Sequence, residues 1–372
     1  MSVTASCAPV FILLFALLLA FPKYAIDGAS DGLLLWFHTV IPALAPAMIC
    51  SRMILANGGV RILMRPFAPL FRRIFSLSET GSFILLSGML CGYPLGPALC
   101  TQALEKHQIS PKEASYLLAI CSYPSPMFLL GYVRQQLDSA PTGSSYLVWL
   151  LLTGIYAPVF LLSLAARIQF CMLPGTFCPE LYSEMKKAGI PECQKPRGNS
   201  STSDSAPHQA PVTLDECLYS TCDTMVLIGG YLMLFSILSC FLNHAAWIPA
   251  PIAAALCGIT EMTTGIRQIC RVFPRSIQLP ACAASAAFGG ISGVFQVRSV
   301  MQIQDVSTEC SSGSSSHRQT DPSQKSLLYN NKNAGYDIRH YVGWKLLHAG
   351  LSAMILTVLP QVPLLLQAPR RW

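Results

Sequence analysis

The sequence predicts an all-α polytopic membrane protein made of two inverted repeats, with broken or re-entrant helices and about seven to nine membrane segments. Composition is the first reason, since 52% of the 372 residues are hydrophobic and only 12% are charged, against about 25% charged in soluble proteins. The second is a set of nine apolar stretches that approach or exceed the length needed to span a hydrocarbon core of about 30 Å. The third is a pair of similar segments interrupted by glycine and proline. The stretches lie near residues 8 to 26, 32 to 55, 82 to 104, 114 to 133, 145 to 168, 223 to 242, 247 to 266, 279 to 298 and 341 to 367.

The chain divides into four parts. Residues 1 to 31 hold the first apolar stretch, which lacks the positively charged start of a secretory signal and is expected to stay as a transmembrane helix. Residues 32 to 168 and 223 to 367 form the two membrane repeats. Residues 169 to 222 are rich in Pro, Ser and Lys and predict a polar linker, and the serine-rich residues 307 to 333 predict a disordered loop within the second repeat.

Basic residues indicate which side of the membrane each loop faces. Three basic loops are expected on the cytosolic side, whereas residues 243 to 246 carry no Lys or Arg and suit the opposite side. The repeats are then inverted, which requires an odd number of crossings in each, so the stretches 114 to 133 and 279 to 298, rich in Gly or Pro, are expected to be re-entrant. The alternative is that all nine stretches cross and the repeats are not inverted. The basic loops contain Arg61, Arg65, Arg72 and Arg73; Lys186, Lys187, Lys195 and Arg197; and Arg267, Arg271 and Arg275.

The sequence contains no pattern typical of an enzyme. It has no GxSxG, HExxH or Walker motif, so catalysis is not expected. The 15 cysteines show no CxxC spacing and mostly lie in apolar stretches, where they are expected to be packing residues rather than ligands of a metal or a redox site. No cofactor is expected. The net charge of +7 lies in loops, so it indicates membrane topology rather than binding to nucleic acid.

Duplicated interruptions predict a substrate site. The first reads Leu90-Cys-Gly-Tyr-Pro-Leu-Gly96 and is followed by Ser125-Pro-Met-Phe128, while the second reads Leu256-Cys-Gly258 and is followed by Ser292-Gly-Val-Phe295. A helix broken within the bilayer frees backbone groups for a polar substrate, and the helix N-terminus at such a break suits a carboxylate. Each residue taken alone is equally compatible with a simple kink. The candidate binding residues are Gly92, Tyr93, Pro94, Gly96, Ser122, Tyr123, Ser125, Ser292 and Gln296.

The last apolar stretch of each repeat also begins in a similar way. Tyr146-Leu-Val-Trp149 matches Tyr341-Val-Gly-Trp344, and leucines follow in both. His38 and His348 lie within apolar stretches, where a hydrogen bond between helices is favoured over a role in proton relay.

Glu261 is an acid within an apolar stretch, in the segment Gly258-Ile-Thr-Glu-Met-Thr-Thr-Gly265. Such acids are costly in a membrane and usually serve a function. The functional interpretation is that Glu261 binds a coupling cation or proton, or takes part in gating. The structural alternative is a carboxylate that caps a helix.

Together these segments resemble the sporulation integral membrane protein family of the YlbJ type, whose halves belong to the nucleoside-recognition, or Gate, domain group. The resemblance implies two Gate-like membrane repeats and a transporter that moves dipicolinic acid, a small anionic dicarboxylate, across the outer forespore membrane, which derives from the mother cell. The implied partners are this substrate and the lipid bilayer, and a homo-oligomer is left open. The matching pieces are Ile41-Pro-Ala-Leu-Ala-Pro46, Gly92-Tyr-Pro-Leu-Gly96, Ser110-Pro-Lys-Glu-Ala114, Ser125-Pro-Met-Phe128 with Gly131, Gly229-Gly230, Glu261 with Thr263 and Gly265, Gly290-Ile-Ser-Gly293 with Gln296, and Asp337-Ile-Arg339 with His348.

Dipicolinate is a planar dianion, and two broken helices with opposed N-termini suit its two carboxylates, with Tyr93 or Tyr123 available to stack on the ring. Two alternatives remain from the sequence. One is a carrier of nucleosides or other organic ions, and the other is a membrane scaffold of spore assembly that transports nothing.

Overall fold

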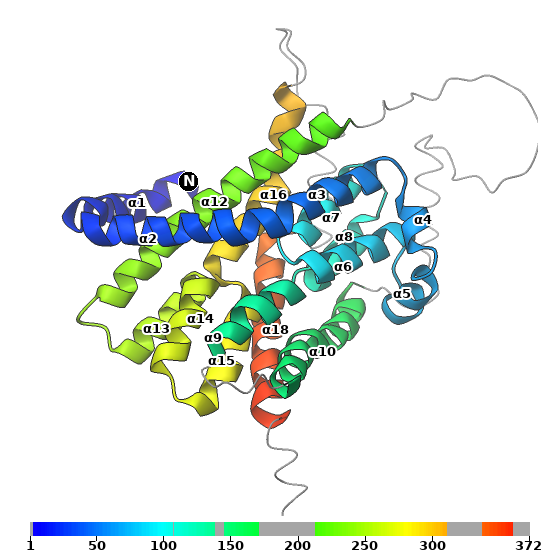
Figure 1. Cartoon of the computed structure of the whole chain (residues 1–372). Coiled ribbons are helices and arrows are strands. Elements are labelled where there is room, and N and C mark those ends of the chain that lie inside the picture. Colours follow the sequence, from blue (N-terminus) through cyan, green and yellow to red (C-terminus); the bar gives the residue numbers. More distant parts are fainter. Residues whose placement is uncertain (1–2, 107, 138–144, 171–212, 311–336, 360–372) are drawn as a thin grey trace, which may run out of the picture.

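The computed structural model describes residues 3–106, 108–137, 145–170, 213–310 and 337–359 (Figure 1). Every regular element in these ranges is a helix, which confirms the all-α prediction. Five helical segments are long and apolar enough to cross a membrane, or six if one bent pair is counted, so the predicted seven to nine segments are not confirmed. The five are Pro22–Ala56, Tyr146–Gln169, Leu214–His244, Arg275–Met301 and Ile338–Val358.

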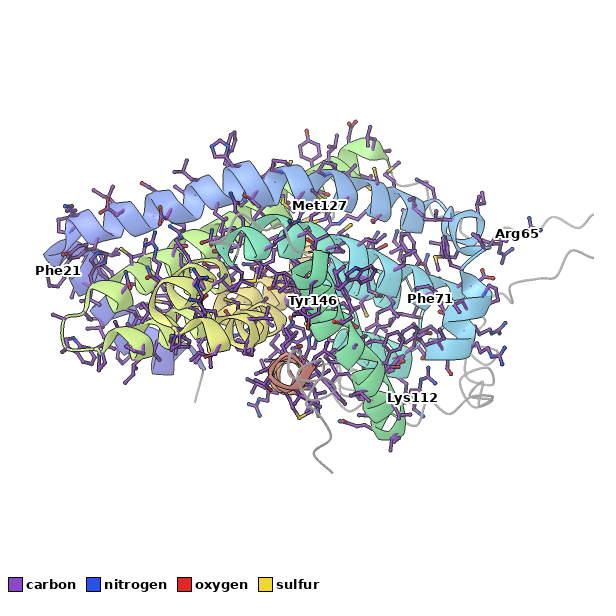
Figure 2. The ribbon with its side chains drawn as sticks, turned by 60° about the horizontal axis from the view of Figure 1, so that its bottom comes forward. Phe21, Arg65, Phe71, Lys112, Met127 and Tyr146 are labelled. Carbon is purple, nitrogen blue, oxygen red and sulfur yellow. The ribbon has the colours of Figure 1, made fainter. Side chains whose placement is uncertain are left out.

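Two long helices lie side by side across the molecule. After α1 (Val3–Ala20), α2 (Pro22–Leu35) continues through the π-helical turn η1 (Trp36–Val40) into α3 (Ile41–Ala56). This helix passes through residue 31, where the sequence suggested that the first repeat begins. Phe21, just before this helix, and Arg65, in the short segment that follows it, lie at opposite ends of the molecule (Figure 2).

The partner of this long helix is α12 (Leu214–His244), which packs along both α2 and α3. Glycine makes the approach possible, because a Cβ atom on Gly28 would lie only 2.7 Å from the Cα of Ile237. α12 begins within the expected linker of residues 169 to 222, and residues 171–212 of that linker lie outside the described ranges. The expected loop at residues 307 to 333 also lies outside them from residue 311 onward.

The remaining helices follow the same order in both halves: two short helices, a broken helix and a final long helix. In the first half a short elbow, α4 (Val60–Met64) and α5 (Ala68–Phe75), comes before them and meets α6 at 90°. The first half then contains α6 (Glu79–Cys91), α7 (Leu95–Glu105), α8 (Pro111–Ile120), η2 (Phe128–Val133) with α9 (Arg134–Leu137), and α10 (Ser145–Gln169). The second contains α13 (Ala250–Thr260), α14 (Met262–Val272), α15 (Arg275–Phe288), α16 (Gly290–Cys310) and α18 (Ile338–Val358).

The first two short helices of each half fold back on one another. A Cβ atom on Gly265 of α14 would lie 2.1 Å from the Cα of Gly258 in α13. Residues seven apart in one straight helix are about 10 Å apart along its axis, so α13 and α14 form a hairpin with its tip at Glu261. In the first half, a Cβ on Gly88 of α6 would lie 3.3 Å from the Cα of Gly96 in α7, which indicates a second hairpin.

Contacts at the open end of the first hairpin agree with this arrangement. The backbone N–H of Ser78, just before α6, donates to Glu113 Oε1 at 2.8 Å, close to the start of α8. The chain therefore returns after α7 to the end from which α6 started. Ser78 also caps α6 by accepting from the N–H of Gly81 at 3.0 Å, and Ser110 caps α8 by accepting from the N–H of Glu113 at 3.1 Å.

This arrangement bears on two expectations. The prediction that residues 279 to 298 are re-entrant is not confirmed, because α15 and α16 together make a segment long and apolar enough to cross, whereas the Leu-Cys-Gly stretches fold back as hairpins. The loop near residue 246 and the loop before Arg275 also lie at the same end of a hairpin (lower left in Figure 1). From the number of basic residues in each, these two loops were expected on opposite sides of the membrane. A re-entrant hairpin returns the chain to the side it came from, which loop charges alone do not reveal.

By length and apolarity, two of the five candidate spans lie in the first half and three in the second. Inversion requires an odd number of crossings in each half, and it stays a prediction.

Two apolar clusters hold the helices together. The first joins α3, α6, α7 and α8 to Met225, Ile228 and Leu232 of α12. The second joins Leu129 and Leu151 of the first half to Ala283 and Leu356 of the second. The halves are thus fused through buried side chains rather than linked as separate bodies.

The α13–α14 hairpin provides the first testable prediction. Gly265→Ala places a methyl group where the Cα of Gly258 lies, and is expected to destabilise the protein by about 1–3 kcal/mol because the hairpin must open. The matched control is Gly350→Ala, at a helical glycine with nothing within 4 Å of an added Cβ. Melting of the purified protein in detergent measures both variants. Equal melting temperatures would contradict the hairpin packing.

Candidate functional site

Four interruptions of helices meet near the centre of the molecule. The first break is residues 92 to 94 between α6 and α7, and the second is residues 121 to 125 between α8 and the helical turn leading into η2. The third is Glu261 between α13 and α14, and the fourth is Gly289 between α15 and α16. The first two come from one half of the chain and the last two from the other.

Within each half the two breaks contact one another through the backbone. The N–H of Tyr93 in the first break donates to the carbonyl of Tyr123 in the second at 3.1 Å. In the other half, a Cβ on Gly290 would lie 3.2 Å from the Cα of Glu261, so the third and fourth breaks are also in contact. Gly289 and Gly290 have φ values of 84° and 73°, which favour glycine.

Glycines in each hairpin leave room for the helix that follows it in the chain. A Cβ on either Gly88 or Gly96 would lie 2.2 Å from the carbonyl oxygen of Cys121, so this oxygen occupies a notch between α6 and α7. In the second half, the Ser285 hydroxyl donates to the Gly258 carbonyl at 2.9 Å. Gly96 therefore has a packing role that the sequence did not indicate.

Tyrosines connect the two halves at the breaks. The hydroxyl of Tyr93 reaches Met262 Sδ and, at 3.4 Å, the carbonyl of Ala286. A Cβ on Gly289 would lie 2.8 Å from the Tyr93 hydroxyl oxygen, so glycine leaves room for the ring. From the same half, the Tyr132 hydroxyl donates to the Thr263 carbonyl at 2.6 Å.

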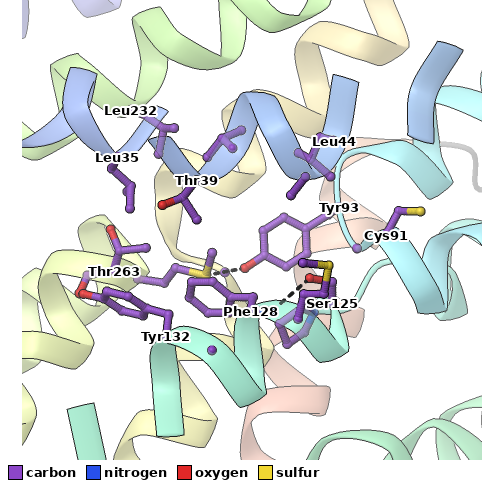
Figure 3. Close-up of a pocket in the computed structure, with 18 of the residues that line it drawn as sticks. Leu35, Thr39, Leu44, Cys91, Tyr93, Ser125, Phe128, Tyr132, Leu232 and Thr263 are labelled. Atoms are coloured by element: carbon purple, nitrogen blue, oxygen red, sulfur yellow. Dashed lines mark hydrogen bonds between the residues drawn. The ribbon is translucent and has the colours of Figure 1, made fainter. Parts of the chain in front are cut away.

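A cavity of about 480 Å³ lies where these elements meet (Figure 3). This volume is within the usual range of small-molecule sites, about 300–1,000 Å³. Its lining is mainly apolar, with polar groups contributed by both halves. Six of the ten residues proposed from the sequence line it: Gly92, Tyr93, Ser125, Glu261, Ser292 and Gln296.

The other four sequence candidates, Pro94, Gly96, Ser122 and Tyr123, are not among the lining residues. The Ser122 hydroxyl pairs with Tyr341 at 3.3 Å, and its carbonyl accepts from Lys345. The ring of Tyr123 packs edge-on against His348, with ring centres 5.6 Å apart. These contacts hold the second break in place on the side that faces away from the cavity.

Glu261 is the helix cap of the structural alternative, and its role in coupling or gating stays a prediction. It is the N-cap of α14, and its carboxylate accepts from the N–H of Thr263 at 3.0 Å and of Thr264 at 2.8 Å. Both threonine hydroxyls also donate to it. Yet its side chain is only 1% exposed and lines the cavity. A capping carboxylate is therefore present at the site itself.

Thr39 and Tyr132 line the cavity but were missed from the sequence, and His38 was expected there to bond to another helix rather than to line a site. His38 and Thr39 come from η1, and Tyr132 from η2, which are both π-helical. Such turns often mark functional sites, but no sequence pattern signals them. The predicted helix-to-helix hydrogen bond of His348 is confirmed, since its Nε2 lies 2.8 Å from the carbonyl of Ile155 in α10. Within the described ranges, no three His, Cys, Asp or Glu side chains gather as a metal site.

Comparison with known proteins supports the resemblance seen in the sequence. The chain is 32% identical over 126 residues to "Sporulation integral membrane protein YlbJ" of Bacillus subtilis (strain 168). The match covers 34% of this chain and 31% of the relative, so it spans about a third of each protein. No protein-family model matches the chain. No solved structure matches it either. Together with the apolar helices, this relative supports an integral membrane protein.

Glu261→Gln is expected to destabilise the protein by about 2 kcal/mol, because an amide cannot replace a carboxylate that accepts four hydrogen bonds. Glu216→Gln is the control, since the exposed Glu216 also lies at a helix start and accepts there from the N–H of Thr213. That substitution is expected to change stability by less than about 0.5 kcal/mol. Thermal melting in detergent compares the two, and similar losses for both would contradict the buried network.

Proposed function

We propose that this protein is a membrane transporter that carries dipicolinate, a small anionic dicarboxylate, across the outer forespore membrane during sporulation. The observation that supports the proposal most is the meeting of four helix breaks, two from each half, at one cavity of about 480 Å³. Breaks of this kind in duplicated halves are typical of substrate sites in secondary transporters. The sporulation relative and the resemblance to the YlbJ type suggest the substrate.

In each half a helix begins beside the cavity, so its N-terminus would face a bound anion. Ser125 lies at the start of the helical turn leading into η2, where its hydroxyl accepts from the N–H of Phe128 at 3.2 Å. Ser292 and Gln296 lie in the first turns of α16, and the Gln296 amide donates to the Ser292 hydroxyl at 3.1 Å. Helix N-termini carry partial positive charge. Each half would therefore hold one carboxylate of dipicolinate.

Aromatic side chains would hold the ring between these two ends. Tyr93, Phe128 and Tyr132 line the cavity (Figure 3), and the rings of Phe128 and Tyr132 stack with centres 5.3 Å apart. Stacking against flat rings is favourable for a planar heteroaromatic substrate. Glu261 at the start of α14 would bind the coupling cation or proton, or take part in gating.

Filling the cavity at its two serines tests the proposal. Ser125→Leu and Ser292→Leu are each expected to lower the initial rate of dipicolinate uptake into proteoliposomes by about tenfold or more, because the larger side chain occupies the carboxylate position. Ser276→Leu, at an exposed serine in α15, is the control and is expected to leave uptake unchanged. Unchanged uptake in both cavity variants would place the substrate elsewhere.

A carrier of nucleosides or other organic ions is the second candidate, and one observation favours it. Among the described residues that line the cavity there is no Lys or Arg, while Glu261 is present. Such a lining suits an uncharged ring better than an anion. Uridine in excess is expected not to reduce dipicolinate uptake in proteoliposomes, and competition by uridine would favour the broader carrier.

A further inference from the structure

Lys345 is a buried cation with few partners. Its side chain in α18 is 3% exposed, and its ammonium donates to the carbonyl of Ser122 at 3.0 Å. The same nitrogen lies 4.9 Å from the centre of the Tyr93 ring. Within the described part of the chain it forms no ion pair. An ammonium has three donors and is costly to bury in a membrane protein unless it has a purpose.

The internal repeat indicates that packing does not require this lysine. Tyr341-Val-Gly-Trp344 matches Tyr146-Leu-Val-Trp149, so Lys345 corresponds to Leu150 in the first half. Leu150 is also buried, at 5% exposed, and belongs to an apolar cluster. The fold thus accepts an apolar side chain at the equivalent position, and the positive charge is specific to the second half.

Tyr93 stands between this charge and the cavity. Its ring lines the cavity (Figure 3), whereas Lys345 contacts the ring but is not among the lining residues. Within the described residues the Tyr93 hydroxyl has two partners, a thioether sulfur, which is a weak acceptor, and a carbonyl 3.4 Å away. Gly289 and Gly293 both face the ring, and Val297 packs against it in an apolar cluster. The hydrogen bonds that hold the hydroxyl are therefore weak, while the ring itself is buried among apolar side chains.

We propose that Lys345 is the cationic anchor for one carboxylate of the substrate, and that the Tyr93 ring turns aside to admit it. This assignment rests on the proposed function and specifies it: the ligand is an anion, and its charge is neutralised by α18. It also explains how a cavity without Lys or Arg in its lining would select an anion. The carbonyl of Ser122 and the Tyr93 ring would hold the ammonium while the site is empty.

Equilibrium binding to the purified protein tests this with three probes: dipicolinate, its single-carboxylate analogue picolinate, and the dicarboxylate isophthalate. Lys345→Met is expected to weaken dipicolinate binding by about tenfold or more and to remove its preference over picolinate. Lys345→Arg keeps the charge and is expected to retain much of that preference. Leu150→Met, at the matching position of the first half, is the control and is expected to bind like the wild type. Lys345→Gln is measured alongside in case the methionine variant does not fold.

The outcomes separate this assignment from the transport proposal. If the wild type binds dipicolinate and the neutral variants bind it equally well, Lys345 is not the anchor and the proposed function stands. If the wild type binds isophthalate but not dipicolinate, and binding depends on Lys345, the anchor stands and the proposed substrate is wrong. If neither dicarboxylate binds the wild type, both proposals are overturned.

Discussion

Every backbone group freed by a helix break must find a partner inside the protein, because the hydrocarbon of a membrane offers none. The arrangement of this structure follows from that constraint. The break at Tyr93 is closed by the carbonyl of Tyr123, and the carbonyl of Cys121 lies in the notch between Gly88 and Gly96. In the other half, the carboxylate of Glu261 occupies the N–H groups at the start of α14. The breaks lie in pairs here, one from a hairpin and one from the broken helix that follows it, and each hairpin break has a partner for its freed backbone groups.

Pairing the breaks has a consequence for the site. Two pairs, one from each half, bring four helix ends to one place. Side chains of the first half also bond to the breaks of the second, as the hydroxyls of Tyr93 and Tyr132 do. The cavity is bounded by these ends and by the long helix that carries η1. Substrate specificity then depends on a few groups set into an apolar lining, because the backbone at the breaks is largely occupied by its own contacts.

The sequence predicted a large part of this arrangement. Low charge and long apolar stretches predict membrane helices, and the repeated Gly92 and Gly258 segments predict breaks, since glycine and proline weaken a helix wherever it lies. The first break does begin at Gly92, but Gly258 lies within α13 and the break follows it at Glu261. Six of the ten candidate residues line the cavity. The sequence did not show which broken stretch folds back, because a hairpin tip and a kink use the same residues, and the difference lies in contacts such as Gly258 with Gly265.

Other features depend on tertiary contacts alone. The π-helical turns that present His38 and Tyr132 leave no pattern in the sequence. The positions of Ser122 and Tyr123 behind the cavity follow from Tyr341 and His348, more than 200 residues away along the chain. Lys345 is different, because the sequence itself contains this charged residue within an apolar stretch. The match between Lys345 and Leu150 becomes informative only once both residues are seen to be buried.

We expect the four breaks to enclose the substrate together. A structure of the purified protein determined with dipicolinate would show this. The ligand is expected in the cavity between Ser125 and Ser292, with one carboxylate near each half and its ring beside Tyr93 or Tyr132. A dipicolinate molecule bound away from the breaks, with the cavity closed around side chains alone, would contradict it.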